Sequence, residues 1–155
     1  RDFCLSRGLG DVYKRQGIKE VVSMIFNKAT IKDIGVLTDL RTAYLQEDLG
    51  AISGKDLELM KATLPSYYEK HLNKDLMAYV ARHEMDIVSC AFLLIVEKPM
   101  RPSFITGKTG TVLNVYTKPE YRNNGCAKKL MTMMLEDSKA EGMSVIELKA
   151  TEDGY

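Results

Sequence analysis

One segment, residues 111–137, restricts the fold more than any other part of this 155-residue chain. Thr111 to Thr117 is rich in β-branched and aromatic side chains, which is typical of a β-strand. Pro119 then ends the strand, because proline has no N–H to donate to a sheet. After Gly125, apolar residues recur at the spacing of one helix face, namely Ala127, Leu130, Met131, Met134 and Leu135. The segment therefore predicts a strand, a short glycine-containing loop and an amphipathic helix.

The loop of this segment predicts a binding site for an anion. A loop that leads into a helix directs unpaired backbone N–H groups, at the positive end of the helix dipole, toward whatever binds there. Arg122 and Lys128 add positive charge beside it. This combination suits a phosphate group. The alternative is that Gly125 only starts the helix and binds nothing.

The residues around this loop also resemble a known family. Residues Arg122 to Ala127, R-N-N-G-C-A, fit the R/Q-x-x-G-x-G/A signature of the GNAT superfamily of N-acetyltransferases. The preceding run from Tyr116 to Tyr121 is similar to the V-x-P-x-Y run that leads into that signature. The signature is short, and its position after a proline-ended strand and before a helix strengthens the match. The resemblance covers roughly Met24 to Tyr155.

The resemblance implies a binding site for acetyl-coenzyme A, the acetyl donor of the family. In the family the loop holds the pyrophosphate, and the signature strand splays from its neighbour and follows the pantetheine arm. Val115 would offer its N–H to the oxyanion. The implied cofactor-binding residues are Val115, Tyr116, Thr117, Arg122, Asn123, Asn124, Gly125, Cys126, Ala127 and Lys128. Replacing Gly125 with Val is then expected to weaken cofactor binding and to leave the fold intact.

The groups that transfer protons are less well defined by the resemblance. Many family members use a tyrosine as general acid, on the helix after the last strand expected here, and Tyr155 precedes that helix. Some members carry a carboxylate base on the signature strand, where this chain has Asn114, which could only position water or substrate. Tyr155 and Asn114 are therefore the catalytic candidates. Glu69 and His71 fall where relatives line the acceptor site, and an exposed helix surface is the alternative for both.

The hydrophobic pattern predicts a fold of the α/β (α+β) class with the element order β-α-α-β-β-β-α-β. The resemblance implies a GNAT-like mixed, mostly antiparallel central sheet flanked by helices. The first half of the chain is expected to hold a strand over Ile25–Ile31, a helix from the N-cap Asp33 to near Gly50, and a helix after Ser53 that is interrupted near Pro65. Two strands, Leu76–Ala81 and Ile87–Val96, are expected next, joined near Glu84. The signature strand follows, then the signature helix, which Gly142 ends, and a strand from Val145 to Ala150.

The sequence also makes predictions about the two ends of the chain. Residues Asp11 to Gln16 can be back-translated into a transposon end sequence, and Lys19 to Val21 into a ribosome-binding site placed just before Met24. We expect residues 1–23 to be a translated non-coding leader, with a genuine extension as the alternative. Family members continue with another helix and a strand hairpin, so we expect residues 24–155 to be an acetyltransferase domain truncated at its C-terminus. A natural early stop is the alternative.

Composition limits the class of protein. The hydrophobic fraction of 45% and the charged fraction of 28% are those of a globular domain, and no apolar run is long enough to span a bilayer. A net charge of +1 argues against a nucleic-acid surface. Cys4, Cys90 and Cys126 lack metal-ligand spacing, and their odd number suits a reducing compartment. We expect no metal, and a cytoplasmic, bacterial protein.

The sequence thus predicts an N-acetyltransferase that transfers an acetyl group from acetyl-coenzyme A to a primary amine of a small molecule or peptide. The resemblance implies direct attack without an acyl-enzyme. The alternative is a catalytically inactive coenzyme A-binding regulatory or sensor module, which Asn114 in place of a carboxylate favours. The identity of the acceptor and the formation of a homodimer are left open.

Overall fold

The computed structural model describes residues 23–143 and 145–148. These residues form a five-stranded sheet in the order β1-β2-β3-β4-β5, in which only the β4–β5 pair is parallel. The elements are β1 Met24–Lys28, α2 Ile34–Leu49, α3 Gly54–His71, β2 Leu76–His83, β3 Asp86–Glu97, β4 Lys108–Thr117, α4 Cys126–Ala140 and β5 Val145–Leu148. The predicted fold class and element order are confirmed.

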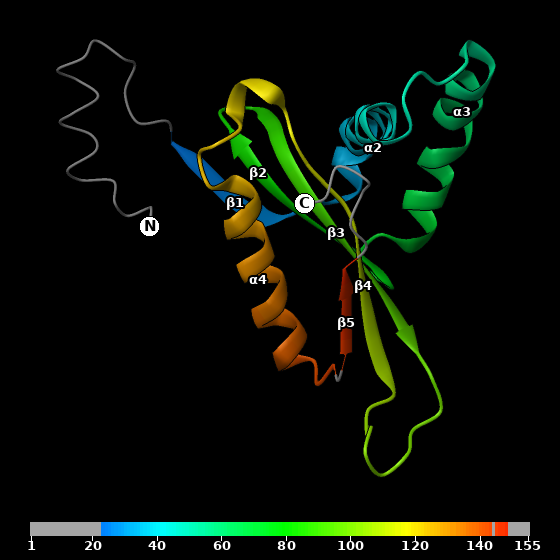
Figure 1. The fold of residues 1–155 in the computed structure, drawn as a ribbon, viewed down its shortest axis with the longest axis vertical. Coiled ribbons are helices and arrows are strands. Elements are labelled where there is room, and N and C mark those ends of the chain that lie inside the picture. Colours follow the sequence, from blue (N-terminus) through cyan, green and yellow to red (C-terminus); the bar gives the residue numbers. More distant parts are fainter. Residues whose placement is uncertain (1–22, 144, 149–155) are drawn as a thin grey trace, which may run out of the picture.

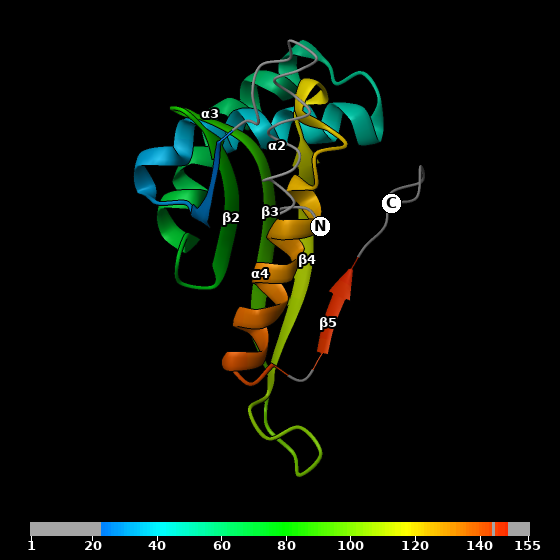
Figure 2. The ribbon, with the colours of Figure 1, turned by 90° about the vertical axis from the view of Figure 1, so that its left-hand side faces the viewer.

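The sheet has helices on both faces (Figure 1). On one face, Leu37 and Leu40 of α2 and Tyr68 of α3 pack with buried residues of the sheet such as Phe92. On the other face, α4 runs along the sheet, and Leu130 of that helix belongs to a second buried cluster. Figure 2 shows α4 lying over the strands, with α2 and α3 at one end of the molecule. Each helix therefore buries one apolar stripe, as an α/β arrangement requires.

Helix α3 continues through Pro65, so the predicted interruption is wrong. A proline inside a helix costs about 3 kcal/mol, because it removes one N–H and crowds the preceding turn. The residues after Pro65 offset this cost by burial, since Tyr68 is 1% and Leu72 4% exposed. The Ser53 side chain accepts a hydrogen bond from the Asp56 N–H at 3.1 Å and caps the helix start.

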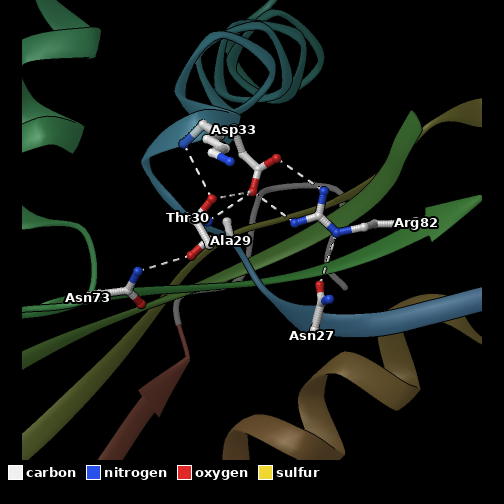
Figure 3. A network of polar contacts seen from close by, with 7 residues as sticks. Asn27, Ala29, Thr30, Asp33, Asn73 and Arg82 are labelled. Atoms are coloured by element: carbon white, nitrogen blue, oxygen red, sulfur yellow. Dashed lines mark hydrogen bonds and ion pairs between the residues drawn. The ribbon is translucent and has the colours of Figure 1, made fainter. Parts of the chain in front are cut away.

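The start of α2 differs from the prediction in the role of Asp33. Strand β1 ends at Lys28, and a short 3-10 helix, Ile31–Asp33, precedes α2 with Thr30 as its cap. Asp33 occupies the N-cap position of α2, but its side chain makes no capping bond. The carboxylate instead accepts hydrogen bonds from the Thr30 N–H at 2.8 Å and from both terminal nitrogens of Arg82 at 3.0 and 2.8 Å (Figure 3).

Helices α2 and α4 both end at or just before a glycine, as the sequence predicted. Gly50 has φ +87°, and Gly142 has φ +76° with its N–H bonded to Lys139 O at 3.0 Å. Both glycines have a positive φ, which glycine adopts without the steric cost of a side chain. The buried face of α4 is Cys126, Leu130, Met134 and Ser138. Leu135, which was expected on the apolar face, is 44% exposed.

Candidate functional site

Strand β4 contains a β-bulge at the start of the expected cofactor segment. Phe92 of β3 pairs with Leu113, whereas Cys90 pairs with Tyr116, so two residues of β4 stand opposite one of β3. Asn114, inside the bulge, has φ +53°. Leu113 and Tyr116 consequently both face the core beneath α2 and α3. The bulge shifts the alternation of side chains by one residue.

The side chain of Asn114 is committed to the bulge itself. It is 1% exposed, its Oδ1 accepts a hydrogen bond from Arg41 Nη1 at 3.3 Å, and its Nδ2 lies 3.4 Å from Cys90 Sγ. Asparagine is one of the few residues that adopt a left-handed conformation readily. Burial raises the pKa of the Cys90 thiol to about 12, so this neighbour is uncharged. A catalytic role for Asn114 stays a prediction, and the contacts observed are those of a structural residue.

One edge of β4 is only partly paired with β5 among the described residues. In the described part of the chain, pairing between β4 and β5 extends from Thr109–Val145 to Val112–Leu148 and no further. Figure 2 shows β5 leaning away from β4 toward its C-terminal end. Backbone groups of β4 beyond Val112 on this edge therefore have no strand partner among the described residues, which end at Leu148 of β5, and the splay that the family resemblance implied stays a prediction.

The loop after β4 ends at an uncapped helix start. A 3-10 turn, Pro119–Tyr121, follows the strand, and Asn123 and Gly125 have φ of +67° and +79°. Gly125 is the N-cap of α4, and no side chain caps this helix. A Cβ placed on Gly125 would meet no atom within 4 Å, so the space in front of the helix start is open. The first N–H groups of α4 are thus free to bind an anion.

A cavity of about 350 Å³ lies between this loop and α2. Nine of the ten predicted cofactor residues line it, all except Asn124, whose Nδ2 donates to Tyr121 O at 3.1 Å. The sequence did not identify the other wall, which comes from α2. The complete lining is Tyr44, Glu47, Asp48, Val115, Tyr116, Thr117, Tyr121, Arg122, Asn123, Gly125, Cys126, Ala127 and Lys128. Tyr44 and Asp48, four residues apart on α2, carry the only sequence signal for this wall, a polar and aromatic pair on one helix face.

Arg122 crosses the cavity and does not point into the loop. Its Nη2 lies 2.7 Å from Glu47 Oε2, its Nε donates to Thr117 O at 2.7 Å, and its guanidinium lies 5.4 Å from the centre of the Tyr116 ring. Burial, followed by the negative charge of Glu47, raises the pKa of Tyr116, so its phenol stays protonated. Lys128 is exposed at the mouth of the same cavity, and no carboxylate of the described residues pairs with it.

The other predicted residues lie away from the cavity. His71 Nδ1 is 2.8 Å from Asp75 Oδ1, and its ring lies 4.5 Å from that of Tyr67. Glu69 is exposed, and Tyr155 lies outside the described residues. Within residues 23–143 and 145–148, no three His, Cys, Asp or Glu side chains are grouped as metal ligands would be. No helix in this part of the chain is long and apolar enough to cross a membrane.

Comparison with known proteins agrees with this geometry. Curated proteins give no significant match. A predicted acetyltransferase from Clostridium acetobutylicum, solved with acetyl-CoA, is 27% identical, with 85% of this chain and 84% of that chain covered and a TM-score of 0.74. A GCN5-related N-acetyltransferase from Ralstonia eutropha has a TM-score of 0.73 at 22% identity, with 84% and 86% covered. An aminoglycoside acetyltransferase from an uncultured soil metagenomic sample has a TM-score of 0.63 at 18% identity, with 84% and 81% covered. A sequence model of the acetyltransferase (GNAT) family matches residues 37–154, and the chain therefore belongs to that family.

Proposed function

We propose that the protein transfers the acetyl group of acetyl-coenzyme A to the nitrogen of a primary amine by direct attack. The observation that carries this proposal is the continuity of the opened edge of β4 with the uncapped start of α4. The edge of β4 and the start of α4 line the same cavity, with Val115 at one end of this stretch of chain and Lys128 at the other. An extended ligand with a phosphate at one end matches both parts.

The residues present fit such a donor. The backbone N–H groups at the start of α4 would hold the pyrophosphate, and Lys128 supplies positive charge at the same place. Val115, Tyr116 and Thr117 would pair their free edge with the amides of the pantetheine arm. Asn123 and Gly125 both have a positive φ that turns the chain tightly, and the space beside Gly125 is open.

The bound cofactor supplies a thioester from which the acetyl group moves to nitrogen, as a C–N bond forms and the C–S bond breaks. The protein must stabilise negative charge on the carbonyl oxygen, and we assign this to the Val115 N–H beside the bulge. The amine gives up one proton and the leaving sulfur accepts one. Tyr155 and Asn114 remain the predicted groups for these transfers.

We place the reaction in the bacterial cytoplasm. Cys90 and Cys126 are buried and free, which accords with a reducing compartment. Proteins of similar fold come from bacteria, including Clostridium acetobutylicum and Ralstonia eutropha.

Gly125→Ala tests the donor site. At φ +79° an alanine costs about 1–2 kcal/mol, so the earlier expectation that Gly125→Val leaves the fold undisturbed needs correction. Because strain at this residue rotates the N–H groups of the helix start, we expect the affinity for acetyl-coenzyme A to fall about tenfold or more. Calorimetric titration with acetyl-coenzyme A measures the affinity, and thermal unfolding measures the strain.

Gly50→Ala is the matched control. Gly50 also has a positive φ and open space around its Cβ position, but it does not line the cavity. This variant should lose stability and retain its affinity for the cofactor. Equal affinity of wild type and Gly125→Ala for acetyl-coenzyme A would contradict the assigned donor site. Tight binding of acetyl-coenzyme A without turnover on any amine would favour the regulatory or sensor module.

A further inference from the structure

Among the described residues Arg41 has no counter-ion, and it lies beside the bulge. It lies on the sheet-facing side of α2, partly buried, and its Nη1 donates to Asn114 Oδ1 at 3.3 Å. No carboxylate in the described part of the chain lies within ion-pair distance of it, whereas Arg82 and Arg122 each have one. A guanidinium has five N–H donors, and the one hydrogen bond observed uses only one of them. A partly buried arginine in this state is available to bind an anion.

Tyr68 provides a second donor beside Arg41. Its side chain is 1% exposed, and its hydroxyl makes no hydrogen bond to any described residue, although buried hydroxyls are nearly always bonded. Burial raises the pKa of this phenol, and the positive charge of Arg41 opposes the rise. Tyr68 packs in the same cluster as Leu40, the residue before Arg41, and Leu113, the residue before Asn114. The phenol is therefore protonated and could donate a hydrogen bond to an acceptor atom placed near Arg41.

Arg41 and its partner Asn114 are close in the chain to two residues that line the donor cavity. Arg41 precedes Tyr44, a residue of the cavity wall, by three positions on α2, and its partner Asn114 precedes Val115, another wall residue. Tyr67, on which the charge of Arg41 also acts, is 37% exposed, so the surface of α3 near Arg41 reaches solvent. A molecule bound to Arg41 would lie next to the bulge, through the contact of Arg41 with Asn114.

We propose that Arg41, assisted by the Tyr68 hydroxyl, binds a carboxylate of the acceptor, so that the substrate is an amine that also carries an acidic group, such as an amino acid. The proposal rests on the proposed acetyl transfer and specifies its second substrate. A guanidinium and a carboxylate match in shape and form two parallel hydrogen bonds. With the acid anchored at Arg41, the amine is directed toward Val115 and the donor cavity.

The charge of the pocket favours a carboxylate over a phosphate. Among the described residues, Arg41 is the only cation whose charge acts on Tyr67, Tyr68 and Cys90, and the only carboxylate that acts on them is Asp75, on Tyr67. One positive charge balances one carboxylate, whereas a phosphate dianion would be left with an uncompensated charge in a partly buried place. The nearby Cys90 thiol is neutral and adds no repulsion.

Matched acceptors that differ only in this charge test the proposal. Acetyl transfer is measured with L-amino acids and with their carboxamides, for wild type, Arg41→Gln, Arg41→Lys and Tyr68→Phe. Wild type should prefer the acids in kcat/KM, and Arg41→Gln should reduce the acid-to-amide ratio about 10- to 100-fold, with Arg41→Lys in between. Tyr68→Phe should raise KM for the acids a few-fold. Glutamine can still donate to Asn114, so the bulge and the affinity for coenzyme A should be unchanged.

The control is Arg101→Gln, which removes the same charge from the loop after β3. It should leave the acid-to-amide ratio of kcat/KM as in wild type. A wild-type enzyme that acetylates the amides as well as the acids would overturn the proposal, as would an unchanged ratio in Arg41→Gln. Should no acceptor turn over, the shift in Tm caused by each acid and amide with coenzyme A present gives the same comparison. Failure to bind acetyl-coenzyme A contradicts the donor site itself, which separates the two proposals.

Discussion

Two arginine–carboxylate pairs in the described residues have the same chemistry and different surroundings. Asp33 and Arg82 meet at 2.8 Å with side chains 14% and 22% exposed, and Glu47 and Arg122 meet at 2.7 Å with side chains 50% and 40% exposed. The first pair is bidentate and has further hydrogen bonds, including Arg82 Nε to Asn27 Oδ1 at 3.0 Å (Figure 3). The second pair spans the donor cavity.

The difference shows that the location of an ion pair decides its role. Asp33–Arg82 joins the segment before α2 to β2, and both side chains are largely shielded from solvent, so loss of one partner leaves the other poorly solvated. Glu47–Arg122 is screened by solvent, so forming or breaking it costs little. The first pair therefore stabilises the fold, and the second is free to exchange when an anion enters the cavity.

The largest effect is expected at the shielded pair. Arg82→Met should lower the free energy of unfolding by about 2–4 kcal/mol, because it leaves the Asp33 carboxylate largely buried without its partner. Arg122→Met should cost less than about 1 kcal/mol. Urea unfolding of both variants measures the contrast, and equal losses would show that the surroundings of the two pairs do not matter.

An effect of intermediate size is expected from acid. Hydrogen bonding by Arg82 lowers the pKa of Asp33, so the stabilisation is complete above the ordinary carboxyl range near pH 4 and is lost as the pH falls through the lowered value. Asp33→Asn should therefore be about 1–2 kcal/mol less stable than wild type at neutral pH. The gap should begin to narrow below about pH 4 and close as the pH falls through the lowered pKa of Asp33. A gap that stays constant from neutral to acid pH in urea titrations would contradict the assigned cause.

The smallest effect is expected at the exposed pair. Glu47→Gln removes a negative charge from the cavity and releases Arg122, so the affinity for acetyl-coenzyme A should rise about three- to tenfold. Stability should change by less than about 0.5 kcal/mol. Glu58→Gln removes the same charge from an exposed position on α3 and should change neither quantity. Calorimetry that finds weaker binding in Glu47→Gln would mean that Glu47 positions the loop.

The parts of the molecule that the sequence predicted well depend on local chemistry. Pro119 and Gly125 act through their own backbone preferences, so the strand, loop and helix around them could be read directly. The helix end at Gly142 is of the same kind. Each of these features is decided by residues within a few positions of one another.

The parts that were missed depend on contacts between distant segments. Arg82 is 49 residues from Asp33, and this contact diverts a side chain that was expected to cap α2. Glu47 is 75 residues from Arg122, so no pattern near the loop indicates the second wall of the cavity. Pro65 predicts a break in the helix, because the burial of Tyr68, which offsets the cost of the proline, is not visible in the local sequence. Tertiary packing overrides local preference in each case.

The extra residue at Asn114 has a consequence for exchanging segments between related enzymes. A strand transplanted without it would present Tyr116 and Val115 to the opposite layers, since a slip of one position reverses every later side chain. Chimeras should therefore be joined by counting from this asparagine and not from the glycine downstream. A single deletion here would misdirect the exit of the chain toward α4, however well the grafted motif matched.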